Sequence, residues 1–349
     1  MIRFESDYLE GAHPLILEKM LSANPEQTPG YGVDEYCESA RKKIRAACAL
    51  EDNAGVHFLS GGTQANLTAC AAFMKPWQGV ICAETGHIAV HESGSVEATG
   101  HKVLTLAHKN GKITGAQVDA YVTAHYAQDN FEHTVQPGMV YISQPTEYGT
   151  LYTKAELKEI YAACRKHGLV LFVDGARLIY ALRSSQNDVA LSDLARLCDA
   201  FYIGGTKAGA LLGEAMVITD PALDRDFRYM LKQRGGMLAK GRLLGIQFDV
   251  LFTDDLYLEI SARANALSDY IRSELTAIGV KFAVPSPTNQ LFPILKDEVV
   301  RSLSDRYSFS YWESAGEGKS VVRICTSWAT ARENVENLVK DLKMAIDRA

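Results

Sequence analysis

Two charged residues stand at the ends of apolar stretches, where a charge is unusual. Asp174 ends the run LVLFVD (169–174), and Lys207 follows the run DAFYI (199–203) after a short turn. A buried carboxylate is unfavourable without a cation beside it. Asp174 therefore has two interpretations. It is a residue that caps a turn or a helix, or it is the partner of a cation, which could be Arg177 or a protonated heterocycle. Lys207 is either a solvated surface residue or a desolvated amine, which has a lowered pKa and acts as a nucleophile.

Taken together, Asp174 and Lys207 indicate a particular cofactor. Because they follow successive strands, they can face one crevice at the carboxyl edge of an α/β sheet. Pyridoxal 5′-phosphate (PLP) requires a lysine amine that binds its aldehyde, and an acid that keeps its pyridine nitrogen protonated so that the ring accepts electrons. We therefore predict that the chain binds PLP, with Lys207 and Asp174 as catalytic residues.

A phosphate site is predicted where a strand turns into a helix, in the segment HFLSGGTQANLTACAAF (57–73). The free amides of the first helical turn, with Gly62, Thr63 and Gln64, would face an anion that the helix dipole also favours. Thr206, next to the lysine, could supply a further hydroxyl. The segment is neither a P-loop nor a dinucleotide fingerprint, and two glycines before a helix are often only a turn.

The segment AETGHIAVHESG (83–94) contains two histidines four residues apart, His87 and His91, with Glu84 and Glu92 close by. A zinc site would place both imidazoles on one helix face, but the order HxxxHE differs from HExxH, so we predict no metal. In the cofactor interpretation, His87 stacks on a planar ring and His91 lies near the substrate. The alternative is that both are ordinary polar loop histidines.

Composition narrows the remaining classes of protein. The chain has 349 residues, 47% of them hydrophobic, and a formal net charge of −6 without a basic block, so nucleic-acid binding is not expected. No apolar run approaches about 20 residues, and the N-terminus lacks an apolar signal segment, so neither a membrane span nor a signal peptide is expected. Seven scattered cysteines without a CxxC pair favour a reducing, cytoplasmic location.

The elements that position these residues alternate between short apolar runs and helical patterns, which predicts an α/β fold with a mostly parallel sheet covered by helices on both faces. The clearest helices are 116–126 and 154–167, each preceded by a capping-box threonine. The runs read as strands are 56–59, 79–83, 102–106, 139–143, 169–174, 199–203 and 214–219. From about residue 245 the pattern changes, so we predict a large cofactor-binding domain over 1–245, with an N-terminal arm over 1–25, and a smaller α+β domain over 246–349.

With these features in order, the chain resembles the threonine aldolase / β-eliminating lyase family of fold-type I, aspartate-aminotransferase-like PLP enzymes. The resemblance implies that Asp174 contacts the pyridine nitrogen, that Lys207 binds the cofactor and that His87 stacks on the ring. It places Arg177 beside the cofactor and the substrate carboxylate, which Arg323 also holds. The motifs are FESDYLEG (Ser6), TPGYGVDE (Tyr31), SGGTQAN (Thr63 and Gln64), GHIAVHESG (His87), VDGARL (Asp174 and Arg177), GGTKAGAL (Lys207) and VVRICTSW (Arg323).

The sequence also departs from the family pattern at positions near the substrate. Residues 144–147 read QPTE where the aldolases have E-N-T-H, and His91 replaces a phenylalanine or tyrosine. After the GGM of RGGMLAK (234–240) the usual R-Q is missing, so Lys240 or Arg234 would have to reach the phosphate. His133 lies at about the spacing of a second aldolase histidine.

The resemblance implies a PLP-dependent aldolase that cleaves a 3-hydroxy-L-amino acid, L-threonine or L-allo-threonine, to glycine and an aldehyde. Ser6 would help Arg177 and Arg323 to hold the substrate carboxylate, and His87 or His133 would be the base. The alternatives are another lyase reaction in the same pocket, either β-elimination or cleavage of a bulkier 3-hydroxy-amino acid, and a cofactor-holding protein with a relic site. The family pattern also implies a homo-oligomer, at least a dimer and by analogy a tetramer, in which Tyr31 and the 234–240 segment serve a neighbour's site.

Overall fold

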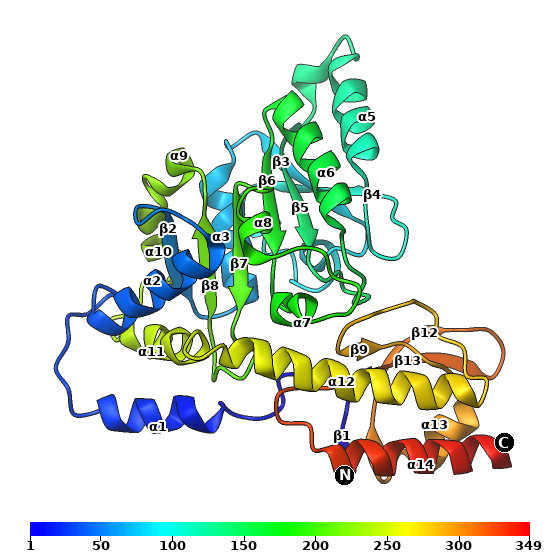
Figure 1. Ribbon diagram of the computed structural model, residues 1–349. Coiled ribbons are helices and arrows are strands. Elements are labelled where there is room, and N and C mark those ends of the chain that lie inside the picture. Colours follow the sequence, from blue (N-terminus) through cyan, green and yellow to red (C-terminus); the bar gives the residue numbers. More distant parts are fainter.

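The computed structural model describes all residues from 1 to 349, and its centre is a seven-stranded sheet (Figure 1). All seven predicted strands are present, with ends that shift by at most three residues. In spatial order they are β2 (Gly55–Leu59), β8 (Glu214–Ile218), β7 (Ala200–Gly204), β6 (Val170–Asp174), β5 (Gln136–Ser143), β3 (Gln78–Ala83) and β4 (Lys102–Leu106). Only β8 runs antiparallel to its neighbours β2 and β7, which confirms the prediction of a mostly parallel sheet.

Helices cover both faces of this sheet because its strands are apolar on both sides. Successive residues point to opposite faces, so that Ile81 belongs to one core cluster and Val80 and Cys82 to the other. The larger cluster packs under α2 (Glu35–Cys48), α5 (Gly115–Tyr126), α6 (Lys154–His167), α7 (Leu178–Leu182), α8 (Leu191–Leu194) and α11 (Arg242–Leu251). The smaller cluster packs under α3 (Gly62–Phe73), α4 (His87–Val90) and α10 (Phe227–Gln233).

The predicted helix signals are confirmed at α5 and α6. Thr114 and Thr153 each accept from the backbone three residues on, and the side chains of Gln117 and Glu156 return the contact, so both capping boxes are formed. α6 ends at Gly168, whose φ of 65° is the left-handed conformation that favours glycine. The remaining short elements of this region are η1 (Glu97–Thr99), η2 (Phe131–His133) and α9 (Pro221–Asp224).

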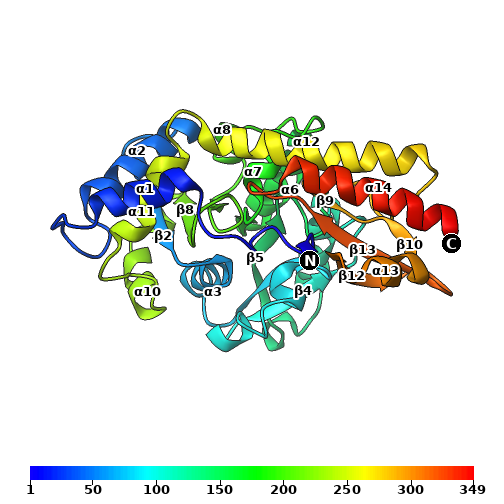
Figure 2. The same cartoon turned by 90° about the horizontal axis from the view of Figure 1, so that it is seen from below.

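The C-terminal part has its own core cluster beneath two long helices. Its elements are α12 (Leu256–Ala277), β9 (Gln290–Leu291), β10 (Ile294–Lys296), α13 (Asp297–Leu303), β11 (Tyr307–Ser308), β12 (Ser310–Ser314), β13 (Lys319–Cys325) and α14 (Arg332–Arg348). The first strand of the chain, β1 (Ile2–Arg3), pairs in parallel with β11, and α1 (Pro14–Ala23) then packs against α11. Figure 2 shows the N-terminus beside these late strands, so residues 4–10 pass between the two parts of the chain.

No helix is both long enough and apolar enough to cross a membrane.

Candidate active site

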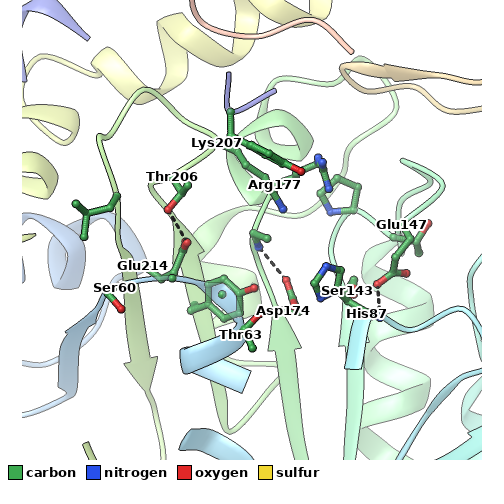
Figure 3. A pocket seen from close by; sticks show the side chains of 18 residues that line it. Ser60, Thr63, His87, Ser143, Glu147, Asp174, Arg177, Thr206, Lys207 and Glu214 are labelled. Carbon is green, nitrogen blue, oxygen red and sulfur yellow. Dashed lines mark hydrogen bonds between the residues drawn. The ribbon is translucent and has the colours of Figure 1, made fainter. Parts of the chain in front are cut away.

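A cavity of about 290 Å³ lies at the carboxyl ends of β5, β6 and β7, which is the edge where the sequence predicted the chemistry (Figure 3). It brings together seven of the predicted site residues from four separate segments of the chain. These are Gly62, Thr63, His87, Asp174, Arg177, Thr206 and Lys207. The cavity walls also contain Tyr8, Ser60, Ser143, Thr146, Glu147 and Glu214.

Asp174 ends β6 and is only 4% exposed, yet several neighbouring groups donate hydrogen bonds to its carboxylate. The Tyr141 hydroxyl donates to it at 2.6 Å, the Asn66 side-chain amide at 3.0 Å and the Ala176 backbone N–H at 2.9 Å. Burial alone would raise the pKa of Asp174, but the charge of His87 and the hydrogen bond from Tyr141 hold it below its ordinary value. The carboxylate is therefore ionised and suited to hold a protonated ring nitrogen.

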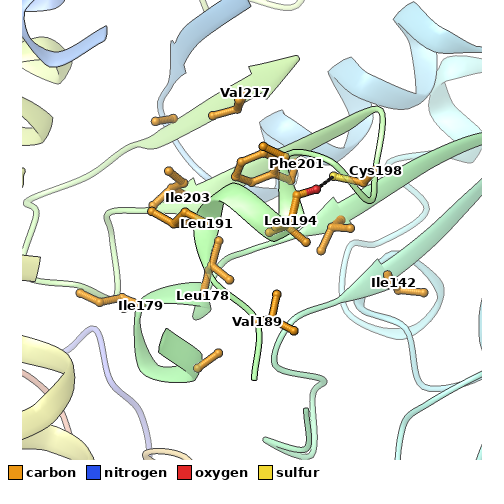
Figure 4. Packing of buried hydrophobic residues seen from close by; sticks show 14 of the residues in the cluster. Ile142, Leu178, Ile179, Val189, Leu191, Leu194, Cys198, Phe201, Ile203 and Val217 are labelled. Atoms are coloured by element: carbon orange, nitrogen blue, oxygen red, sulfur yellow. Dashed lines mark hydrogen bonds between the residues drawn. The ribbon is translucent and has the colours of Figure 1, made fainter. Parts of the chain in front are cut away.

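The segment after Asp174 is fixed by the core beneath it. Leu178 and Ile179, the first residues of α7, are each 1% exposed and pack into the larger cluster (Figure 4). Arg177 lies between these two anchored side chains of α7 and the buried strand β6. Its backbone is therefore held on both sides and has little freedom to move. The apolar residues of the VDGARL motif thus position its charged ones.

Arg177 forms a bidentate ion pair with Asp7, a residue that the sequence reasoning did not select. Arg177 Nε lies 2.7 Å from Asp7 Oδ2 and Nη2 lies 3.0 Å from Oδ1, and Asn289 donates to Oδ2 at 2.9 Å. Although Asp7 is fully buried, the positive charges of Arg177 and Lys207 lower its pKa to about 2. This pair fixes the plane of the guanidinium at the cavity wall.

Lys207 follows β7 in a turn that closes against the backbone of β8. A side chain at Gly205 would place its Cβ 2.7 Å from the Gly213 carbonyl oxygen, so this turn requires glycine there. Burial and the charge of Arg177 lower the pKa of Lys207, and the nearby carboxylates only partly oppose this effect. The amine is therefore closer to its nucleophilic form than a solvated lysine is.

His87 begins α4 and is held by a buried carboxylate. Its Nδ1 lies 2.7 Å from Glu92 Oε1, and its backbone N–H donates to Glu147 Oε1 at 2.9 Å. The side chain of Glu92 is fully buried and also accepts from Asn66 at 2.7 Å, so Asn66 links Glu92 to Asp174. A carboxylate at Nδ1 favours the tautomer with its proton there, which leaves Nε2 free to accept one.

The start of α3 has the character of an anion site. Gly61 occupies the N-cap position without a side-chain cap, so the first amides of the helix have no side-chain partner. Thr63 lines the cavity, but Gln64 is engaged elsewhere: it accepts from the Ser60 hydroxyl at 2.9 Å and donates to the Arg234 carbonyl at 3.0 Å. The amides and hydroxyls that face the cavity fit a phosphate group.

Ser6 and Arg323 are predicted to hold the substrate carboxylate, and each has an unsatisfied polar atom. Ser6 Oγ and Arg323 Nε are buried without a hydrogen-bond partner, although Arg323 Nη2 donates to the Glu5 carbonyl at 2.9 Å. Unsatisfied buried donors of this kind fit an anionic group that is supplied by a ligand. The ring of His91 lies 5.6 Å from that of His87, and burial together with the charges of His87 and Arg323 lowers the pKa of His91.

Seven of the predicted residues do not line the cavity: Ser6, Gln64, His91, Arg323, Tyr31, Lys240 and His133. Tyr31 is 47% exposed, its backbone N–H donates to the Ala239 carbonyl at 3.1 Å, and Lys240 is the next residue on the same exposed surface. His133 lies in η2, before the first residue of β5, whereas the cavity lies at the last. The structure therefore does not place His133 where it could act as the base, and His87 is left as the candidate histidine. Spacing along a sequence does not tell which end of a strand a residue will approach.

Sequence reasoning missed several residues of this site. Asp7 stands next to Ser6 in a motif that was already selected, so its position was a usable signal. Asn66 is the last residue of the selected motif SGGTQAN, so its position was a usable signal too, whereas Tyr141 lies inside an apolar strand where nothing in the local pattern marks it as a partner of Asp174. Glu214 is the first residue of a strand, where an acidic residue has no local feature that marks it as part of a site.

Comparison with known proteins assigns the class. A profile of the family described as "Beta-eliminating lyase" matches residues 4–345, and the chain belongs to this family. Members of the family depend on PLP, so the predicted cofactor is confirmed, together with a PLP-dependent lyase as the class of enzyme.

Individual relatives narrow the comparison further. A low-specificity L-threonine aldolase of Pseudomonas aeruginosa is 31% identical over 347 residues, which covers 99% of this chain and 98% of the relative. The structure of a threonine aldolase from Leishmania major superposes with a TM-score of 0.96 at 44% identity, over 99% of this chain and all of that one. An aspartate aminotransferase of Thermus thermophilus, at 16% identity and a TM-score of 0.72 over 99% of this chain and 91% of its own, shares the fold and confirms the predicted fold type.

Proposed function

We propose that the protein is a PLP-dependent aldolase that cleaves L-threonine or L-allo-threonine to glycine and acetaldehyde. The observation that carries the proposal is the convergence of Lys207, Asp174 and the His87–Glu92 pair on one cavity. The full-length similarity to proteins named threonine aldolases supports the substrate class. When bound, PLP supplies an aldehyde that captures the substrate amine and a ring that accepts the electrons of the broken Cα–Cβ bond.

Each residue of the chain has a defined task in this reaction. Asp174 holds the ring nitrogen in its protonated form, and Lys207 provides the amine that anchors the cofactor between turnovers. Arg177, already fixed by Asp7, binds the substrate carboxylate together with Arg323, and this orients the bond that breaks.

The proton of the β-hydroxyl goes to Nε2 of His87, directly or through water, because Glu92 occupies Nδ1. As that proton leaves, the hydroxyl oxygen forms the carbonyl of the departing aldehyde, and Cα later takes up a proton to give glycine. Ser6 Oγ adds a hydrogen bond to the carboxylate.

A second candidate reaction uses the same cavity. Pro145 and Glu147, which stand where the family has asparagine and histidine, are part of its wall, and burial raises the pKa of Glu147. Because these residues differ from those of the aldolases, the cavity could favour a different reaction. The two candidates are cleavage of a bulkier 3-hydroxy-amino acid and β-elimination of a substituent from Cβ. The product distinguishes these reactions: an aldehyde and glycine from cleavage, or a keto acid and ammonia from elimination.

The central test replaces Lys207 by alanine. We expect loss of turnover and loss of the absorbance of the lysine-bound cofactor, which borohydride reduction traps only in the wild type. Lys158→Ala, on the exposed face of α6, is the matched control and should retain both. If Lys207→Ala kept a reducible cofactor and normal turnover, the proposal would be wrong.

We further propose a homo-oligomer, at least a dimer and by analogy a tetramer, that shares its sites. The exposed pair of Tyr31 and Lys240 supports this, because both are predicted site residues and neither reaches the cavity of its own chain. A mixed oligomer of Lys207→Ala and Tyr31→Ala subunits would regain activity if the sites are shared. We also propose that the chain divides into a domain over residues 1–245 and a smaller one over 246–349, and that the protein is cytoplasmic. The cytoplasmic location is supported by the seven cysteines, which are all free and buried.

A further inference from the structure

Glu214 is a buried carboxyl group in the cavity for which the reaction has no use. It is the first residue of β8, is 3% exposed, and lines the cavity together with Lys207 and Thr63 (Figure 3). Its Oε2 accepts from the Gly205 backbone N–H at 3.1 Å, and its Oε1 lies 2.9 Å from the hydroxyl oxygen of Thr206. An ionised carboxylate at this place would repel the cofactor phosphate, which the amides of α3 and Thr206 are expected to bind.

The hydroxyl of Thr206 has only one proton to give. Its oxygen accepts from the Gly213 backbone N–H at 3.0 Å. If Glu214 is ionised, the hydroxyl donates to Oε1 and nothing remains for an anion in the cavity. If Glu214 is protonated, Oε1–H donates to the hydroxyl oxygen, and the hydroxyl proton is free. The only other acceptor near the Thr206 hydroxyl is the Gly213 carbonyl oxygen, and at 3.5 Å it is too distant to compete for the hydroxyl proton.

Charge and burial indicate which state is present. Burial raises the pKa of Glu214 to about 8, with Lys207, Thr206 and the Gly205 amide opposing this and Asp174 adding to it. Tyr202 is the other titratable group that faces the carboxyl, and its own pKa lies well above 10 because of burial and Asp174. Near pH 7 the carboxyl is therefore neutral, and a phosphate dianion brought beside it favours the neutral form further.

We propose that Glu214 is a positioning residue for the cofactor phosphate: its neutral carboxyl donates to Thr206 Oγ1 and so turns the threonine hydroxyl into a phosphate donor. The proposal rests on PLP as the cofactor and adds a proton that must be present when the phosphate binds. No bond is made or broken in this step, and only the direction of one hydrogen bond changes.

The consequence is a phosphate affinity that falls at high pH. If only the neutral form binds, the apparent Kd is divided by the neutral fraction, which decreases about tenfold between pH 7 and pH 9 for a pKa of about 8. The phosphate itself remains a dianion over this range. Lys207 also titrates, so a ligand that shares the aldehyde but lacks the phosphate is needed to separate the two effects.

The test measures equilibrium binding of PLP and of pyridoxal to the apoenzyme from pH 7 to pH 9, by the absorbance of the lysine-bound form. For the wild type we expect the ratio of the pyridoxal Kd to the PLP Kd to fall about tenfold over this range. In Glu214→Gln the side-chain amide donates permanently to Thr206, so the ratio should be independent of pH. Glu159→Gln, an exposed carboxyl on α6, should behave as the wild type does.

Calorimetry gives a second readout, because PLP binding at pH 9 should take up nearly one more proton than pyridoxal binding does. A ratio that stays flat in the wild type overturns the proposal even if the glutamine variant does not fold, and so does a ratio that still falls in Glu214→Gln. If neither ligand forms the lysine-bound species, the proposed function fails. If both bind with a flat ratio, only the role of Glu214 is refuted.

Discussion

Replacing Asp7 by asparagine removes the charge that holds Arg177 in place and should destabilise the fold strongly. The carboxylate is fully buried, and it accepts two hydrogen bonds from the guanidinium and one from Asn289. Its pKa falls from 3.8 to about 2 on folding, and at about 1.36 kcal/mol for each pH unit this corresponds to about 2.4 kcal/mol. Asparagine also leaves a buried guanidinium without an anion, so we expect a loss of about 3–5 kcal/mol.

The assay is urea unfolding of the apoenzyme at fixed protein concentration, with Asp269→Asn as the matched control. Asp269 also pairs with an arginine, Arg272, but it is 49% exposed, so its replacement should cost at most about 1 kcal/mol. The contribution of Asp7 has a defined pH dependence, because its pKa is lower in the folded state. It is complete above the unfolded pKa of 3.8 and disappears as the pH falls toward 2.

A free energy of unfolding for Asp7→Asn within about 1 kcal/mol of that of Asp269→Asn at pH 7 would contradict this expectation. The buried pair would then contribute no more than a surface pair does. A variant that unfolds easily and also shows a raised KM would indicate that Asp7 orients Arg177 toward the substrate carboxylate.

Three further substitutions test other contacts of the site. Tyr141→Phe removes a 2.6 Å hydrogen bond to the ionised form of Asp174, so the pKa of Asp174 should rise and kcat should fall about tenfold; a pH–rate profile with an unshifted acid limb would contradict this. Glu92→Gln removes the anion at Nδ1 of His87 and should lower kcat at least about tenfold with little change in KM, as steady-state kinetics can measure. Arg323→Lys replaces a planar donor pair by a single ammonium and should raise KM about tenfold; an unchanged KM for the amino acid would place its carboxylate elsewhere.

The sequence predicted the site best where local chemistry and strand pattern coincide. Asp174 and Lys207 each follow an apolar run, and a charge at the end of a buried strand has few structural explanations. Thr63 was found for a similar reason, since a glycine turn into a helix exposes amides. The antiparallel direction of β8 also follows from the sequence once the ends of the strands are known, because the segment 205–213 is too short for a crossover.

Contacts between distant segments could not be predicted in this way. Asp7 meets Arg177 across 170 residues, and it does so because β1 pairs with β11 and carries the following residues past the cavity. A two-residue strand has no periodicity to recognise, so its partner is set only when the C-terminal core has formed. His133 shows the opposite error, in which a plausible spacing corresponds to the wrong end of β5.

Four carboxyl groups in and beside the cavity divide into two kinds according to their neighbours. Asp7 and Asp174 have cations or several donors beside them, and their pKa values are lowered despite burial. Glu214, which is 3% exposed, and Glu147, which is only partly buried, have hydroxyl and backbone donors but no salt bridge, and burial raises their pKa values. When the surroundings of two carboxyl groups shift their pKa values in opposite directions, one site can hold an anion and a neutral acid at the same pH. The first pair can therefore hold cationic partners, the ring nitrogen and Arg177, whereas Glu214 can donate a proton to the hydroxyl oxygen of Thr206.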